Sequence, residues 1–65
     1  MKVKTMQQLK KLRLKNKLTQ VDVARAIGCA RPIYSLMEQG RMEPSEVQWA
    51  AFAKLYNVSV SYLQK

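Results

Sequence analysis

The widest apolar face predicted for this chain lies in the segment that follows Pro44 and Ser45. Its apolar side chains fall at i, i+3, i+4 and i+7, at Trp49, Phe52, Ala53 and Tyr56. This spacing is typical of a helix that buries one face. An aromatic row could instead stack the bases of a single strand, but helical spacing favours packing in the core. We therefore expect this helix to supply the centre of the hydrophobic core.

Residues 19–27 carry the signals of a shorter helix. Thr19 is a good N-cap, because its side-chain oxygen can accept a hydrogen bond from the free backbone N–H groups of a helix that begins at Gln20. Gly28 supplies the left-handed residue that ends such a helix. An apolar stripe runs along it at Val23, Ala24 and Ile27. We predict a helix of about two turns that buries this stripe.

A further short helix is predicted after residues 29–30. Pro32 suits a first-turn position, where its missing N–H costs nothing. Tyr34 and Met37 lie three residues apart and are expected to face inward, and Gly40 closes the helix. Two short helices joined by a tight turn that contains glycine form the unit that places its second helix in the major groove of DNA. Residues 19–40 are therefore interpreted as a helix-turn-helix.

The remaining segments predict one helix before this unit and one after the aromatic helix. The first runs from about Thr5 to Lys15 and packs Leu9, Leu12 and the following Leu18 inward. Asn57 ends the aromatic helix, Val58 points inward, and Ser59 caps a short last helix with Val60, Tyr62 and Leu63. A chain of 65 residues has room for one domain with a small core. We predict an all-α, compact five-helix domain over residues 1–65.

Positive charge is concentrated at the start of the chain. The formal net charge is +8, from 12 Lys and Arg against 4 Asp and Glu. The first eighteen residues contain no acid but hold Lys2, Lys4, Lys10, Lys11, Arg13, Lys15 and Lys17. Such a stretch can neutralise DNA phosphates, but it can also be a solvated face or bind an anionic membrane. The stripe at Met6, Leu9 and Leu12 is narrow, which argues against the membrane.

The composition offers little to catalysis or metal binding. The chain has no His and one Cys, so we expect no zinc site and no internal disulfide. No serine has a His partner and no glycine-rich phosphate loop is present, so we expect neither an enzyme nor a cofactor. Cys29 is interpreted as a small apolar residue in the turn, with redox sensing as the alternative. With no signal peptide or long apolar run, we expect a soluble cytoplasmic protein.

Several spaced motifs together resemble the Cro/C1-type (lambda-repressor-like) helix-turn-helix family. The similarity covers about residues 6–63 and rests on Leu18-Thr19-Gln20, Val23-Ala24, Ile27-Gly28, Met37-Glu38-Gln39-Gly40, Pro44-Ser45 and Asn57-Val58-Ser59. The chain departs from the family in three places. It has Ala30 where a small polar cap is usual, Tyr34 where a branched aliphatic residue is usual, and Asn57 where glycine is usual.

The resemblance implies which residues touch DNA. Relatives contact base edges at the positions of Arg31, Pro32 and Leu36, with Ser35 nearby, and these side chains should project away from the core. Arg31 could donate two hydrogen bonds to guanine, and the apolar pair could meet thymine methyl groups. Contacts to the sugar-phosphate backbone are expected from Lys17, Gln20, Ile33, Tyr34, Gln39 and Arg41.

The resemblance also implies a dimer on a double-stranded operator. One module buries too little surface to bind tightly alone, so two copies on a palindromic operator are expected. Candidate dimer contacts are Val60, Tyr62 and Leu63, with Leu55 and Val47 as further possibilities, although these residues could equally fill the core. The function implied is a Cro-like repressor of a phage or mobile element that acts by occupying its operator. The alternatives are a protein-interaction module, such as an antirepressor or antitoxin, and a non-specific binder of nucleic acid or anionic membrane.

Overall fold

Five α-helices follow one another along the chain. A computed structural model describes the backbone of residues 2–64 and the side chains of residues 7–64. The helices are α1 (Lys2–Lys15), α2 (Gln20–Ile27), α3 (Arg31–Glu38), α4 (Glu46–Tyr56) and α5 (Val60–Leu63). The first helix begins three residues earlier than the predicted Thr5. The side chains of Lys2, Lys4 and Met6, which entered the charge and stripe arguments, lie outside the described residues.

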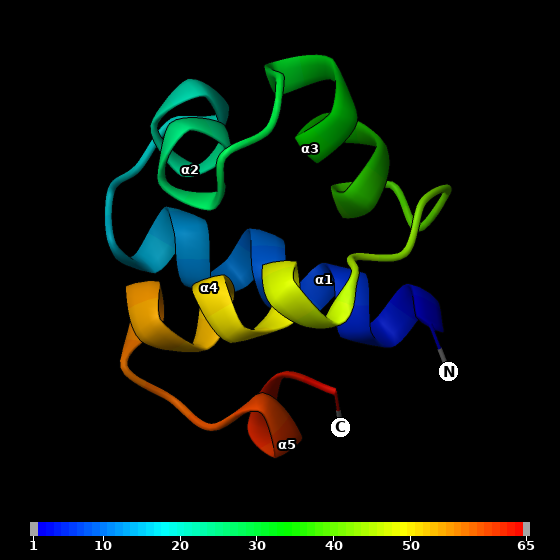
Figure 1. The fold of residues 1–65 in the computed structure, drawn as a ribbon, viewed down its shortest axis with the longest axis vertical. Coiled ribbons are helices and arrows are strands. Elements are labelled where there is room, and N and C mark those ends of the chain that lie inside the picture. Colours follow the sequence, from blue (N-terminus) through cyan, green and yellow to red (C-terminus); the bar gives the residue numbers. More distant parts are fainter. Residues whose placement is uncertain (1, 65) are drawn as a thin grey trace.

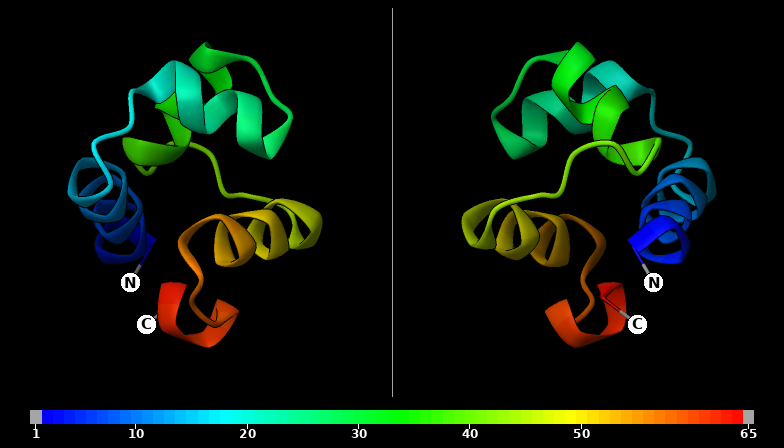
Figure 2. Two further views of the ribbon diagram at one scale, coloured as in Figure 1. Left: turned by 90° about the vertical axis from the view of Figure 1, so that its left-hand side faces the viewer. Right: turned by 90° about the vertical axis from the view of Figure 1, so that its right-hand side faces the viewer.

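The helices form three levels around one core. In Figure 1, α2 and α3 lie at the top, α1 and α4 in the middle and α5 at the bottom. Figure 2 shows that α1 and α4 stand on opposite sides of the molecule at the same level. The α2–α3 pair closes the space between them from above, and α3 contacts α1 while α2 contacts α4. The predicted helix-turn-helix is thus held from below by two separate helices.

The predicted helix ends are confirmed by their caps. The Thr19 hydroxyl accepts a hydrogen bond from the Asp22 N–H (3.1 Å), and the Asp22 carboxylate accepts one from the Thr19 N–H (2.9 Å). This reciprocal pair is a capping box, and Ser45 forms the same arrangement with Gln48. Gly28 has φ 85° at the end of α2. Asn57 has φ 54° at the end of α4, a left-handed conformation that asparagine tolerates.

The start of α3 lacks a side-chain cap. Ala30 occupies the N-cap position and makes no side-chain hydrogen bond. Pro32 follows in the first turn, where its missing N–H removes one donor that the helix leaves free in any case. The helix therefore begins where the sequence predicts, supported by proline geometry and not by a polar cap.

All five helices contribute to the buried core. Tyr34, Phe52 and Trp49 form its aromatic centre, with ring centroids 6.0 Å apart for both neighbouring pairs. The other buried apolar residues are Leu9, Val23, Ala24, Met37, Tyr56 and Leu63. Leu63 is fully buried, so the dimer contact expected of it is wrong in this structure, because its side chain packs inward from α5. Within the described residues, no helix is long and apolar enough to span a bilayer.

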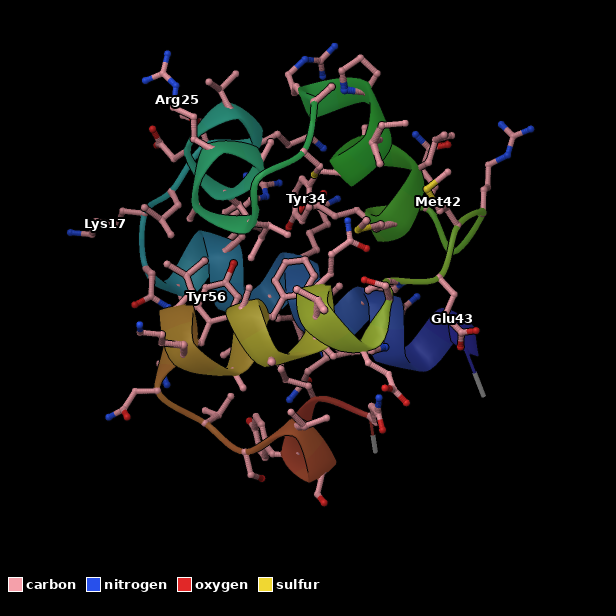
Figure 3. The ribbon with its side chains drawn as sticks, viewed as in Figure 1. Lys17, Arg25, Tyr34, Met42, Glu43 and Tyr56 are labelled. Carbon is pink, nitrogen blue, oxygen red and sulfur yellow. The ribbon has the colours of Figure 1, made fainter. Side chains whose placement is uncertain are left out.

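Two buried tyrosines differ in what their hydroxyl groups contact. The Tyr34 hydroxyl donates a hydrogen bond to Glu38 Oε2 (2.5 Å). Tyr56 also points into the interior (Figure 3). Its buried hydroxyl has no hydrogen-bond partner among the described residues. Burial raises the pKa of both phenols, to about 12 for Tyr56, so both hydroxyls stay protonated at neutral pH.

This difference predicts that the same substitution has different effects at the two positions. Tyr34→Phe removes a hydrogen bond to a charged group and should lower the free energy of unfolding by about 1.5–3 kcal/mol. Tyr56→Phe removes a buried hydroxyl without a partner and should leave that free energy unchanged or raise it by about 1 kcal/mol. Urea unfolding followed by the fluorescence of Trp49 measures both. Equal destabilisation by the two substitutions would contradict the assignment of the hydrogen bond.

Candidate DNA-binding surface

The third helix has one face in the core and one face outside. Tyr34 and Met37 are buried, as the sequence predicts, and Figure 3 shows Tyr34 pointing into the space between the helices. Arg31 and Pro32 are exposed, while Ser35 and Leu36 are half-buried. All four base-reading candidates therefore belong to the part of α3 that faces away from Tyr34 and Met37.

The outer face of α3 carries one polar row and one apolar row of side chains. Arg31, Ser35 and Gln39 recur at intervals of four residues and form a polar row. Gln39 Nε2 donates to Ser35 Oγ at 3.1 Å within this row. Pro32 and Leu36, also four apart, form a parallel apolar row. A surface with adjacent donors and apolar groups matches the base edges of the major groove, which present hydrogen-bonding atoms beside thymine methyl groups.

A partly buried ion pair anchors the end of α3 to α1. Arg13 Nε donates to Glu38 Oε2 at 2.5 Å, and Arg13 Nη2 donates to Glu38 Oε1 at 3.4 Å. The Glu38 side chain is only 5% exposed and that of Arg13 11%. Arg13 also donates to the carbonyl of Leu18 at 3.0 Å, which ties α1 to the loop that leads into α2. Both charges are thus satisfied, as a pair that is largely withdrawn from solvent requires.

Glu38 collects donors from three helices. Besides Arg13 of α1 and Tyr34 of α3, Gln20 of α2 donates from Nε2 to Glu38 Oε1 at 3.0 Å. Burial alone would raise the pKa of Glu38, but the hydrogen bonds from Arg13, Tyr34 and Gln20 outweigh it and hold that pKa below the ordinary value of 4.5. The carboxylate is therefore ionised at neutral pH and acts only as an acceptor.

The same glutamine reaches outward to the first residue of α3. Arg31 Nη1 donates to Gln20 Oε1 at 3.0 Å. A continuous path of hydrogen bonds thus leads from the buried Arg13–Glu38 pair through Gln20 to an exposed guanidinium. The sequence predicts that Gln20 and Arg31 lie at the surface, but it carries no signal for the bond between them. The spacing of Tyr34 and Glu38 at i and i+4 signals their contact, whereas Arg13 lies 25 residues from Glu38 and carries no local signal.

The residues expected to contact the sugar-phosphate backbone of DNA differ in how exposed they are. Lys17, Gln39 and Arg41 are exposed, and Figure 3 shows Lys17 and Arg25 projecting outward. Ile33 is half-buried and packs against the core. The expected phosphate contact of Tyr34 is wrong in this structure, because its side chain is fully buried and its hydroxyl is committed to Glu38.

The turn between α2 and α3 holds the single cysteine. Cys29 is half-buried and packs against the core, and burial raises the pKa of its thiol. A thiol with a raised pKa is a poor nucleophile at neutral pH, which favours the packing interpretation. Among the side chains of residues 7–64, no three His, Cys, Asp or Glu residues come together in a way that could hold a metal ion.

Known proteins share this sequence pattern and this arrangement of helices. A helix-turn-helix family model matches residues 9–63. An uncharacterized HTH-type transcriptional regulator of Bacillus subtilis, YqaE, is 39% identical over 57 residues, which is 88% of this chain. The chain spans about half (49%) of the length of that relative.

The likeness extends to a solved structure. The restriction-modification controller protein C.AhdI from Aeromonas hydrophila matches with a TM-score of 0.85 at 28% identity, covering 94% of this chain and 92% of that one. This match confirms the predicted all-α, five-helix, lambda-repressor-like fold. Because the family model covers most of the residues, the chain belongs to the Cro/C1-type helix-turn-helix family.

Proposed function

We propose that this chain is a transcriptional regulator that binds double-stranded DNA with the outer face of α3 in the major groove. The observation that supports this proposal is the exposed position of Arg31 and Pro32 at the start of α3, above a buried anchor at Glu38. Recognition helices of this kind meet base edges with their N-terminal residues. The anchor fixes the direction in which these residues are presented.

Each group on this surface has a distinct proposed role. Arg31 donates two hydrogen bonds to O6 and N7 of one guanine, while Pro32 and Leu36 contact thymine methyl groups and Ser35 bonds to a neighbouring base. Contacts to the sugar-phosphate backbone set the register and come from Lys17, Gln20, Ile33, Gln39 and Arg41. Tyr34 does not belong to this set, because it is buried and its hydroxyl donates to Glu38.

The regulator acts, in this proposal, as a homodimer on a palindromic operator. A single α3 reads only a few base pairs, so two copies with half-site centres about one helical turn apart are needed for specific binding. Val60 and Tyr62 of α5 are 36% and 43% exposed and are the proposed dimer contacts. Two large apolar side chains exposed on a four-residue helix gain burial when a second copy covers them.

The biological role we propose is repression by occupation of an operator that overlaps a promoter. YqaE is described as a transcriptional regulator and C.AhdI as a controller protein, and we extend a regulatory role to this chain. By its resemblance to Cro-type proteins, we assign it to a phage or another mobile element, acting in the cytoplasm without a ligand.

Selection of bound duplexes from a random DNA pool tests the proposed binding. We expect an inverted repeat that binds at least about a thousandfold better than scrambled DNA. Arg31→Ala should relax the preference at one base pair per half-site, because the substitution removes a contact that discriminates by about 1–3 kcal/mol. If no sequence is enriched and binding only fades with rising salt, the basic surface is the only DNA activity, and partners should be sought among proteins.

Binding to duplexes with one or two half-sites tests the dimer. Tyr62→Ser should weaken binding to the two-site duplex by about tenfold, because it removes apolar area from the proposed contact, and leave one-site binding unchanged. Leu14→Ser is the matched control, since Leu14 is 56% exposed on α1 and has no proposed contact. Equal affinities of wild type and Tyr62→Ser for the two-site duplex would reject the α5 contact.

A further inference from the structure

The outer face of α1 carries lysines and no acid. Leu9 is fully buried on the inner side of this helix. The exposed side chains on the opposite side are Gln7, Lys10, Lys11, Leu14 and Lys15. We call this set the lysine face.

The charges of the lysine face are not balanced within the protein. Among the described side chains, no ion pair reaches any of its lysines. The carboxylate of Asp22 caps α2, and that of Glu38 is paired at the end of α3. Lys11 and Lys15, at i and i+4, repel each other, which weakens a helix slightly. An anion that binds this face removes that repulsion.

The lysines are spaced to meet neighbouring phosphates of one DNA strand. Lys11 and Lys15 are separated by about 6 Å along the helix axis, since each residue adds about 1.5 Å. Phosphates of one strand recur about every 3.4 Å along the duplex axis. A lysine ends in a compact charge on a flexible stem, so the two ammonium groups can adjust to such a row. Lys10, on the other side of Leu14, widens the charged surface.

The composition of the lysine face favours a nucleic acid over a membrane or a protein. A helix that lies in a bilayer surface needs a wide apolar face, and a protein interface needs an apolar centre. The lysine face offers only Leu14, which is 56% exposed, for either purpose. Contacts to phosphates need only the positive charge that this face supplies.

The lysine face continues from a phosphate contact proposed above. Lys17, which is assigned to the sugar-phosphate backbone, is exposed in the turn that directly follows α1. The helix α1 itself lies below the α2–α3 pair and at one side of the molecule (Figure 2). A straight duplex that lies across α3 therefore passes above the lysine face. DNA beyond the operator reaches this face only when it bends toward α1.

We propose that the lysine face is a second DNA-binding surface: it holds the DNA that flanks the operator through phosphate contacts of Lys10, Lys11 and Lys15, and it bends this DNA toward α1. The inference rests on the function proposed above, but the contacts that it adds carry no sequence information. Bending the duplex costs elastic energy, which the extra contacts offset. The affinity for an operator thus depends on the length of the DNA around it, most strongly at low salt.

The first test compares two duplexes, the selected operator alone and the operator with about one further helical turn on each side. Wild type should bind the longer duplex more tightly. The slope of log affinity against log salt should also be steeper on that duplex, by about 0.9 for each lysine that contacts a phosphate. The triple variant Lys10→Gln, Lys11→Gln and Lys15→Gln should lose both differences and bind the short duplex as wild type does.

Two variants control for charge and for the surface itself. Lys54→Gln removes one exposed charge from α4, on the opposite side of the molecule, and should leave the length effect intact, whereas Lys11→Gln should reduce it. Leu14→Ser alters the lysine face without changing its charge and should have no effect. The triple variant should unfold at the same temperature as wild type or a higher one, because repulsion is removed. If it is less stable, Lys11→Gln alone is compared with Lys54→Gln.

The second test measures the bend. Fluorescent dyes at the two ends of the longer duplex should come closer together when wild type binds, because both flanks curve toward the protein. With the triple variant the ends should stay farther apart. Equal energy transfer in the two complexes would contradict the proposed bend.

The outcomes separate this inference from the function on which it rests. Equal affinities and salt slopes of wild type for the two duplexes overturn the inference while the regulator function stands. An equal loss on both duplexes in the triple variant places the lysines on the operator itself and also overturns it. The inference is equally overturned if the triple variant keeps all DNA binding and loses only binding to vesicles of anionic lipid. A wild type that selects no operator overturns both proposals.

Discussion

The carboxylate of Glu38 is the point at which α1, α2 and α3 are joined by hydrogen bonds. It accepts from Arg13, Gln20 and Tyr34, one residue of each helix. Burying a charge is costly unless it is fully paired, and a pair that loses one partner is strongly destabilising. The three helices must therefore adopt one relative arrangement for the charge to be satisfied. Apolar contacts alone would tolerate small rotations of α3, but this set of directional bonds does not.

The arrangement connects the interior of the fold to its surface. At the top of the molecule α3 lies with its inner side packed on Phe52, through Tyr34, and its C-terminal end tied to α1 through Glu38. Its N-terminal end, which lacks a side-chain cap, is reached from α2 by the bond between Gln20 and Arg31. The helix is thus fixed at both ends and along its inner face, and its outer rows are free to meet a ligand.

Most of the fold follows from local signals in the sequence. The caps at Thr19, Ser45 and Ser59, the left-handed residues Gly28 and Asn57, and the apolar spacing of α4 each predict a helix boundary or a buried face from a few neighbouring residues. The order of these features also identified the family. The sequence predicts only part of the candidate site. The exposure of Arg31 follows from helical periodicity, but its hydrogen bond to Gln20 does not.

The structure differs from the sequence-based predictions where a contact joins residues that are far apart in the sequence. Tyr34 was expected at a phosphate, but its side chain is buried and Glu38 accepts the hydrogen bond of its hydroxyl. Leu63 was expected at a dimer contact, but α5 turns it into the core. Neither the Arg13–Glu38 pair nor the packing of a four-residue helix has a local sequence signal, since each depends on how the helices are arranged.

The central claim is that this fold aims Arg31 at a guanine. The most direct measurement replaces each guanine of the selected operator in turn by 7-deazaguanine, which lacks the N7 acceptor, and compares the affinities of wild type and Arg31→Ala. We predict that one guanine per half-site weakens wild-type binding by about tenfold when replaced and has no effect on Arg31→Ala. If no replacement weakens wild-type binding, or if both proteins lose affinity equally, the account is contradicted.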